Sequence, residues 1–184
     1  QHTNLFPVIA DQEALQQARS KASLEQELST ALTGCPDPHQ RRRVLNNFKD
    51  RQMLRVDLRH ILGLQRAFGL FASELTDVAE VIVEAARHIC FEELTQRYGA
   101  PRSRSGALSR LAICALGKCG GRELGFASDI ELMFVYDADG QSDGAEAVSC
   151  LEFHTALVEC FRKSIEARRK GIFEVDLRLR PYGQ

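Results

Sequence analysis

Apolar residues recur every three or four positions over most of the first half of the chain, which is the period of an amphipathic α-helix. A first helix is predicted from Asp11 to about Leu32, because alanine, glutamine, glutamate and leucine dominate that stretch. Asp37 followed by proline is a typical helix start, and this second helix is predicted to run to about Leu62. A third helix is predicted to begin at Thr76 and to end at the Gly-Ala-Pro signal that follows it.

The second half of the chain changes to the short apolar runs and alternation of β-strands. Three strands are predicted: Leu111–Leu116, Ile130–Tyr136 and Ile172–Leu179. One amphipathic helix, from Ala145 to Arg169, separates the last two strands, and the polar stretches 102–106 and 137–144 are predicted loops. The pattern predicts an α+β protein with a helical segment over residues 1–105 and a mixed core over residues 106–184.

Two carboxylates, Asp129 and Glu131, open the second predicted strand. Side chains two positions apart in a strand project from the same face, and the other face of this strand is apolar. Two acids on one face repel each other unless a cation lies between them, and Mg²⁺ favours such ligands together with phosphate oxygens. Just upstream, Gly120 and Gly121 let phosphate oxygens approach the backbone. This stretch therefore predicts metal-assisted chemistry on a nucleoside triphosphate.

The third predicted strand carries another acid, Asp176, with Arg178 on the same face and apolar residues on the opposite face. If this strand lies beside the second, Asp176 joins Asp129 and Glu131, and three carboxylates can hold two Mg²⁺ ions. The acids could instead have a structural role and pair with arginines such as Arg178 or Arg180.

Two blocks of sequence carry a family resemblance. The first combines GKCGGREL at 117–124 with SDIEL at 128–132, and the second is VDLRLRPYG at 175–183. Together they resemble the glutamine synthetase adenylyltransferase/adenylyl-removing family, and the similarity extends back to about Arg41. The glycine pair, the short spacer and the Asp-apolar-acid pattern are similar to the wider nucleotidyltransferase superfamily, which includes DNA polymerase β. The resemblance implies the polymerase β-like fold, a mixed sheet with helices.

The resemblance also implies an activity: transfer of AMP from ATP to a protein tyrosine hydroxyl of glutamine synthetase, or its removal by phosphorolysis. It implies that Asp129, Glu131 and Asp176 are the catalytic residues and bind Mg²⁺ or Mn²⁺, with ATP as the substrate. The residues expected to contact the triphosphate are Gly120, Gly121, Lys118, Ser128, Arg178 and Arg180. For the two glycines, a purely conformational role is the alternative.

One position departs from the family pattern, because the family usually has Asp-x-Asp where this chain has Asp129 and Glu131 separated by one residue. Antibiotic nucleotidyltransferases are similar to this variant. Two further hypotheses therefore stand beside the leading one. The chain could be a catalytically degenerate nucleotide-binding or sensing domain, or a nucleotidyltransferase with a different acceptor.

The net charge and the cysteine pattern of the chain limit which partners and cellular environments are expected. The 184 residues carry a net charge of -1, so no overall field favours nucleic acid or a membrane. The expected partners are glutamine synthetase and a regulatory signalling protein. The six scattered cysteines contain no Cys-x-x-Cys pair, which favours reduced and mostly buried thiols in a cytoplasmic protein over zinc sites or disulfides. The chain is expected to be an excised piece of a longer protein.

The second predicted helix is rich in arginine. These arginines could form a solvated face that pairs with Asp50 and Asp57, or a basic surface that faces nucleotide phosphates or an acidic partner protein. A location beside the predicted carboxylate site would favour the second interpretation.

Overall fold

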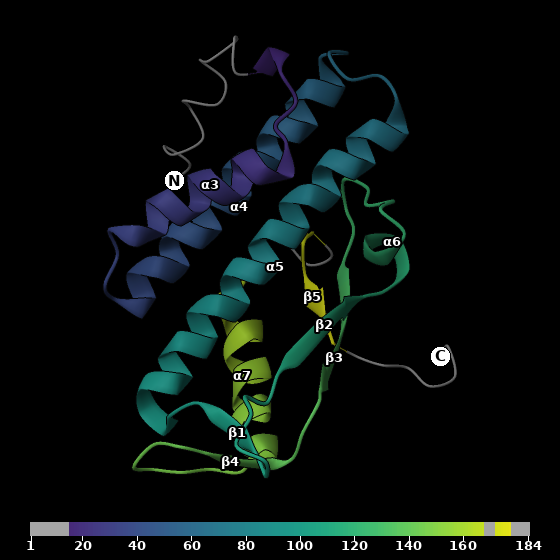
Figure 1. The fold of residues 1–184 in the computed structure, drawn as a ribbon. Coiled ribbons are helices and arrows are strands. Elements are labelled where there is room, and N and C mark those ends of the chain that lie inside the picture. The colour runs from purple at the N-terminus through teal and green to yellow at the C-terminus, as the bar shows by residue number, and fades with distance from the viewer. Residues whose placement is uncertain (1–14, 168–171, 178–184) are drawn as a thin grey trace.

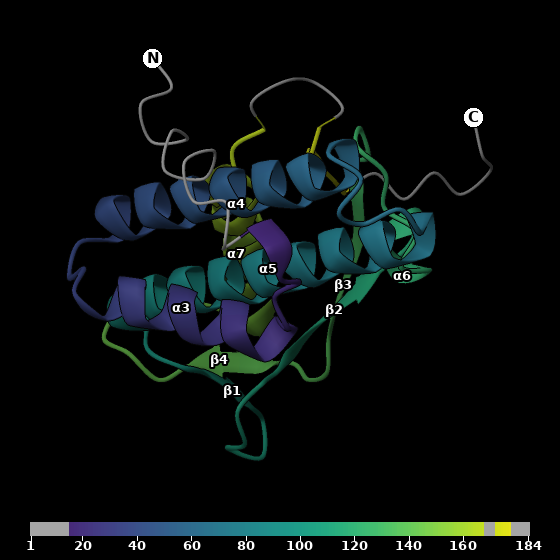
Figure 2. The same cartoon turned by 90° about the horizontal axis from the view of Figure 1, so that it is seen from above.

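A computed structural model of the chain describes residues 15–167 and 172–177 (Figure 1). Its elements are α3 (Lys21–Thr33), α4 (Pro38–Ile61), α5 (Phe68–Tyr98), β1 (Pro101–Ser103), β2 (Leu111–Ala115), α6 (Gly117–Gly120), β3 (Ile130–Tyr136), β4 (Gly140–Ser142), α7 (Cys150–Ser164) and β5 (Val175–Asp176). Helices α3, α4 and α5 run alongside one another, and α7 packs against α5 (Figure 2). Within the described part of the chain, none of the helices combines the length and apolar character that crossing a bilayer requires.

Side-chain caps fix where three of the helices begin. Ser20 before α3 and Asp37 before α4 each accept a hydrogen bond from the amide three residues further on. Ser149 and Glu152 form a reciprocal capping box at the start of α7. A cap of this kind contributes about 1 kcal/mol to helix stability. The predicted start of the second helix at Asp37 is confirmed.

Two predicted helices are shorter than expected. The helix predicted from Asp11 is interrupted at residues 17–20, where the backbone is not helical, and α3 begins directly after its serine cap. The cap of α7 likewise places the first helical residue at Cys150 rather than Ala145. This helix ends at Ser164, and the predicted end at Arg169 lies outside the described residues.

Helix α5 begins at Phe68, a full two turns before the predicted start at Thr76. The reason is packing, because Phe71 and Leu75 continue the buried stripe of the helix toward its N-terminus. The burial of this stripe outweighs the helix-weakening effect of Gly69. The end of the helix is as predicted, with the glycine at position 99 as its C-cap.

The main sheet has three strands in the order β2-β3-β5. Strands β2 and β3 pair antiparallel, whereas β3 and β5 pair parallel. The described part of β5 covers only Val175–Asp176 rather than Ile172–Leu179, because Phe173 adopts a left-handed backbone conformation with φ of 51° that ends the strand geometry. The predicted loops at 102–106 and 137–144 in part form a second sheet, in which β1 pairs antiparallel with β4.

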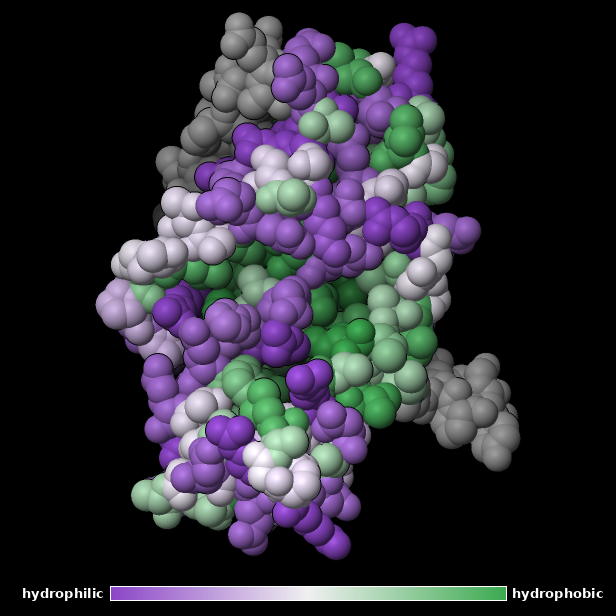
Figure 3. All heavy atoms as spheres, in the orientation of Figure 1, coloured by the Kyte–Doolittle hydropathy of each residue, from purple (hydrophilic) through white to green (hydrophobic). Residues whose placement is uncertain are grey.

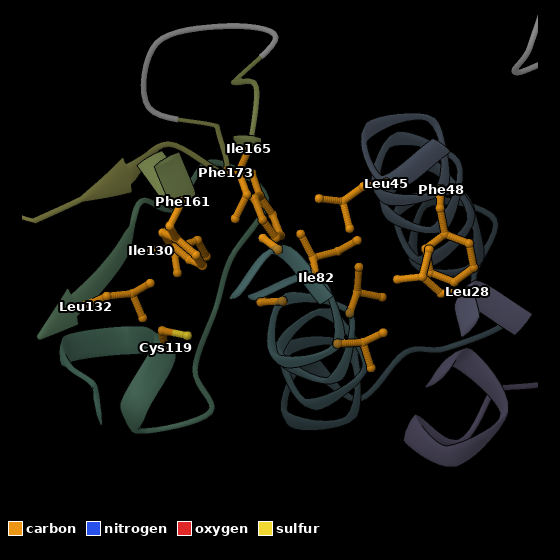
Figure 4. Packing of buried hydrophobic residues seen from close by; sticks show 14 of the residues in the cluster. Leu28, Leu45, Phe48, Ile82, Cys119, Ile130, Leu132, Phe161, Ile165 and Phe173 are labelled. Atoms are coloured by element: carbon orange, nitrogen blue, oxygen red, sulfur yellow. The ribbon is translucent and has the colours of Figure 1, made fainter. Parts of the chain in front are cut away.

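One hydrophobic core joins the helical half of the chain to the sheet. Figure 4 shows this core running from Leu28 and Phe48, past Ile82 of α5, to Ile130 and Phe161. The ring of Phe161 on α7 meets the ring of Phe134 on β3 edge to face, with 5.3 Å between the ring centroids. The core is therefore continuous across the predicted boundary between residues 105 and 106, and it holds β3 against α5 and α7.

Five of the six arginines of α4 make structural contacts, but their partners differ from the predicted ones. Four of them pair with glutamates of neighbouring helices: Arg41 with Glu92, Arg42 with Glu93, Arg51 with Glu27, and Arg59 with Glu74. Arg55 and Arg59 are buried and donate hydrogen bonds to backbone carbonyls of Gln17 and Leu15. These contacts tie α4 to α3, α5 and the segment before α3 rather than presenting a solvated face.

Asp57 on α4 provides a pH-dependent prediction. Its Oδ1 atom is buried without a hydrogen-bond partner in the described residues, and burial raises its pKa from 3.8 to about 7. The unfolded chain releases this proton near pH 3.8 and the folded chain only near pH 7, so stability present at low pH is lost as the pH rises between these values. Allowing for solvent screening, we expect a loss of about 1 to 2 kcal/mol.

Chemical unfolding at a series of pH values checks this prediction. Asp57→Asn should flatten the decline in unfolding free energy between pH 4 and pH 7, and the variant should be the more stable protein at pH 8. A decline of the same size in both proteins would show that another group is responsible.

Candidate active site

The predicted acidic strands lie side by side. In the parallel pairing of β3 and β5, Glu131 is directly opposite Asp176. The pairing continues upstream, where the Ile130 amide donates to the Glu174 carbonyl at 2.8 Å and the Phe173 amide donates to a carbonyl of the preceding loop. The conditional prediction that the third strand lies beside the second is therefore confirmed.

The acids of β3 lie on the side of the strand that faces away from the core. Glu131 and Asp129, the residue just before the strand, are exposed, whereas Ile130 and Leu132 are buried. Asp176 on β5 is half-buried. The predicted division of β3 into an apolar face and an acidic face is thus confirmed, and solvent can reach the acidic face.

A glycine turn follows β2 and lies against the acidic strand. The amide of Leu116 donates to the carbonyl of Glu131 at 2.9 Å, and the chain then enters the single helical turn α6. Gly117 has a left-handed backbone conformation with φ of 51°, and a Cβ atom placed there would lie 2.0 Å from Oε2 of Glu131. The absence of a side chain at this position therefore lets the Glu131 carboxylate lie directly over the turn.

The other two glycines of the turn support the conformational alternative. The amides of Gly120 and Gly121 donate to the carbonyls of Leu116 and Gly117, both at 3.0 Å, so they are already used inside the turn. A Cβ atom on Gly120 would lie 2.5 Å from the carbonyl oxygen of Ala115. Glycine at this position is thus needed for the close approach of α6 to the end of β2. Contact of these glycines with a triphosphate stays a prediction.

The remaining predicted site residues are in different environments. Lys118 is exposed on α6. Ser128 is buried, and its hydroxyl accepts a hydrogen bond from the Gly125 amide at 2.9 Å, which orders the loop leading into β3. Arg178 and Arg180 lie outside the described residues.

The inner side of the glycine turn is anchored in a cleft between α5 and β2. This cleft has a volume of about 390 Å³, and Figure 3 shows apolar side chains in the hollow. Cys119 of α6 and Leu132 of β3 form part of its wall. Burial raises the pKa of the Cys119 thiol to about 11, so the residue stays neutral at physiological pH and serves as an apolar anchor.

Arg122 is a site residue to which the sequence assigned no role. It follows the glycine pair with φ of 58°, and its guanidinium pairs with Asp77 at 2.6 Å and with Glu80 at 2.9 Å, both on α5. Glu80 also pairs with Lys21 of α3 at 2.7 Å. The hydrogen bond to Asp77 raises the pKa of Arg122. This network fixes the end of the glycine turn to two helices of the N-terminal segment.

Comparison of the sequence with known protein families and with individual proteins places the chain in one family. The model of the glutamate-ammonia ligase adenylyltransferase family matches residues 1–184. The chain belongs to this family. The bifunctional glutamine synthetase adenylyltransferase/adenylyl-removing enzyme of Thioalkalivibrio sulfidiphilus is 38% identical over 146 residues, which cover 77% of this chain and 15% of that enzyme. The enzyme of the same name from Pseudomonas aeruginosa is 31% identical over 179 residues, which cover 95% of this chain and 18% of that enzyme.

Membership of the adenylyltransferase family confirms the predicted resemblance, and the observed architecture is the predicted α+β class. The chain spans less than a fifth of the length of these two relatives. The structure therefore describes one part of the family's architecture, in which a helical layer and a small mixed sheet enclose a common core.

The metal ligands that the adenylyltransferase resemblance implies fit a hard cation in their chemistry and strand positions. Glu131 and Asp176 are register partners on neighbouring strands, with Asp129 two residues upstream of Glu131. The described residues do not, however, include three such side chains already gathered around a single point. Glu131 instead lies over Gly117, and because it is exposed, rotation of its side chain costs no core packing.

The Arg122 network can be tested through stability. Arg122→Met should lower the unfolding free energy by about 1 kcal/mol, because it removes two ion pairs at a half-exposed position. Arg87→Met is the matched control, since Arg87 pairs only with Glu84 of its own helix among the described residues, and its loss should cost about 0.3 kcal/mol. Urea unfolding of both variants measures the difference, and equal losses would contradict the anchoring role of Arg122.

Proposed function

We propose that this chain carries the nucleotide- and metal-binding site of an adenylyltransferase, which transfers AMP from ATP to a protein tyrosine hydroxyl or removes it by phosphorolysis. The observation that carries the proposal is the parallel pairing of β3 and β5, which sets Glu131 opposite Asp176 beside a glycine turn. Membership of the adenylyltransferase family supports the same class of reaction.

In this proposal Asp129, Glu131 and Asp176 are the catalytic residues and hold Mg²⁺ or Mn²⁺. The bound metal supplies neutralisation of phosphate charge and polarises the attacking oxygen. The carboxylates suit this role because they are oxygen ligands on a solvent-accessible strand face, close to a turn that a phosphate can approach.

The triphosphate is proposed to bind along the glycine turn. The absence of side chains at Gly120 and Gly121 leaves the turn open to phosphate oxygens, and the exposed ammonium group of Lys118 pairs with one of them. Ser128 contributes at the other end of the site by ordering the loop before β3. Two further arginines, Arg178 and Arg180, are proposed to neutralise phosphate charge.

The acceptor is proposed from the relatives. Their names specify glutamine synthetase as the protein that is adenylylated and from which the adenylyl group is removed. We propose the same acceptor for the protein that contains this chain, a cytoplasmic location, and control by a regulatory signalling protein. The near-zero net charge of the chain supports a protein acceptor over nucleic acid or a membrane surface.

The test is transfer of label from ATP labelled at the α-phosphate, using the natural gene product, glutamine synthetase and Mg²⁺ or Mn²⁺. We expect label to become covalently attached to a tyrosine of glutamine synthetase, and adding phosphate to the labelled protein measures the reverse reaction. Metal-dependent attachment of label to a different acceptor would overturn the choice of acceptor.

Calorimetric measurement of ATP binding distinguishes the adenylyltransferase proposal from the alternative of a nucleotide-sensing domain. We expect ATP binding that requires Mg²⁺ or Mn²⁺ and weakens at least tenfold in Asp129→Asn. Binding without any metal dependence, together with no transfer of label in either direction, would refute the adenylyltransferase proposal and favour the nucleotide-sensing alternative.

A further inference from the structure

Two cysteines from different helices meet away from the acidic strands. Cys90 lies on α5 and Cys160 on α7, and their sulfur atoms are 2.6 Å apart. A disulfide bond is about 2.05 Å long, so the two side chains already point at each other within reach of a covalent bond. The distance between the two sulfur atoms would have to shorten by only about half an ångström to reach the bond length.

The surroundings of the two sulfurs give them different reactivity. The Arg42 guanidinium lies 3.3 Å from the sulfur of Cys160, and the Ser164 hydroxyl lies 3.2 Å from the sulfur of Cys90. The hydrogen bond with Cys90, together with Arg42, lowers the pKa of Cys160 to about 6. The Cys160 sulfur, followed by burial, raises the pKa of Cys90. The contact with Arg42 and the direction of these shifts favour the thiolate form at Cys160 over Cys90.

The two cysteines also differ in access. Cys160 is half-buried and forms part of the wall of a surface cleft of about 580 Å³, whereas Cys90 is fully buried behind it. Charged side chains line the cleft, among them Arg42, Arg43 and Lys163 together with three glutamates, so small polar molecules can enter it. A reactive cysteine at the surface with a second cysteine directly behind it is the arrangement of a redox-sensitive dithiol.

We propose that Cys160 and Cys90 form a modification site at which a peroxide produces a reversible disulfide between α7 and α5. The Cys160 thiolate attacks one peroxide oxygen and the O–O bond breaks, which gives a sulfenic acid and, after protonation, water or an alcohol. The sulfur of Cys90 then attacks the Cys160 sulfur, the S–O bond breaks, and hydroxide leaves with the Cys90 proton as water. The two thiols lose two electrons, the peroxide gains them, and a dithiol reductant reverses the change.

The disulfide would close a loop that contains β2, the glycine turn and β3, because these elements lie between positions 90 and 160. It would also join two helices that pack against each other, α5 and α7. A cross-link over a loop of this length is expected to raise the midpoint of thermal unfolding by roughly 10 °C.

The experiment treats the natural protein with limiting hydrogen peroxide, blocks the remaining thiols, and identifies linked peptides by mass spectrometry. We expect a Cys90–Cys160 linkage that dithiothreitol removes, together with the rise in unfolding midpoint. In Cys90→Ser, dimedone should trap a sulfenic acid at Cys160, whereas Cys160→Ser should give neither product. Absence of the linkage in the wild-type protein, or a sulfenic acid mainly on another cysteine, would overturn the proposal.

Alkylation rates at pH 7 test the role of the surroundings separately. Cys114 is also half-buried and serves as the internal reference thiol. Arg42→Gln should slow iodoacetamide labelling of Cys160 about five- to tenfold, Arg42→Lys should restore most of the rate, and Glu93→Gln should increase it. Labelling of Cys160 no faster than Cys114 in the wild-type protein, or unchanged by all three substitutions, would contradict the proposed thiolate.

Discussion

Replacing Glu131 with glutamine is expected to lower the rate of AMP transfer by about 10²- to 10³-fold, while the midpoint of thermal unfolding stays within about 2 °C of the wild-type value. Glu131 is exposed, so its charge contributes little to the core, but it lies opposite Asp176 on the acidic strand face. Glutamine keeps the shape of the side chain and removes the charge that a divalent cation requires. Asp176→Asn should have the same effect for the same reason. Label transfer from ATP at a series of Mg²⁺ concentrations measures both variants.

Two control variants make the Glu131 prediction specific. Glu123→Gln makes the same chemical change at another exposed glutamate just after the glycine turn, and it should leave the rate within about twofold of wild type. Glu131→Asp restores the acid that the family pattern usually has, so it should retain metal-dependent transfer. Equal losses in Glu123→Gln and Glu131→Gln would indicate a general effect of surface charge and would remove Glu131 from the site.

The sequence predicted which side chains of β3 face away from the core, because strand alternation there is strong. Ile130, Leu132 and Phe134 fall on one face of β3, and this spacing leaves Glu131 on the other face whatever the rest of the fold does. The pairing of β5 with β3 was conditional, because alternation within a strand does not specify which strand lies beside it. The structure supplied that neighbour.

Features that depend on contacts distant in sequence could not be predicted. No local sequence signal indicates that Arg122 pairs with Asp77 and Glu80. These two acids lie on one face of a helix that ends before the sheet begins. Strands β1 and β4 are short and polar, so they have no hydrophobic alternation. They form because β1 follows α5 and β4 precedes α7, and the two helices bring these segments together. Phe173 likewise combines a left-handed backbone conformation with burial in the core, and no local sequence pattern predicts this conformation.

Arg122 and the shared core give the helical segment a role in the site. The glycine turn is held at one end by the β2–β3 ladder and at the other by ion pairs to α5, while Cys119 in the middle is buried in the cleft. The position of the turn relative to Glu131 therefore depends on helices that carry no proposed catalytic residue. Substitutions that loosen the turn should affect both stability and AMP transfer.

Gly120→Ala is expected to lower the unfolding free energy by about 2 to 3 kcal/mol. The added Cβ atom would lie 2.5 Å from the Ala115 carbonyl oxygen, which is part of the rigid backbone at the end of β2 and cannot move aside without disturbing the β2–β3 pairing. The turn would have to shift outward, away from Glu131. We therefore also expect AMP transfer to fall at least tenfold, measured beside urea unfolding of the same variant.

Gly121→Ala is the matched control, because it makes the identical change one residue along the same turn. Its Cβ atom would lie 3.4 Å from the nearest atom, the Gly117 carbonyl oxygen, and the backbone already has a right-handed helical conformation. This variant should stay within about 0.5 kcal/mol of wild type in unfolding free energy. If both alanines cost the same, the close approach of α6 to β2 does not set the position of the turn. If Gly120→Ala loses stability and transfer together while Gly121→Ala keeps its stability, the steric contact at the end of β2 links the fold to the proposed site.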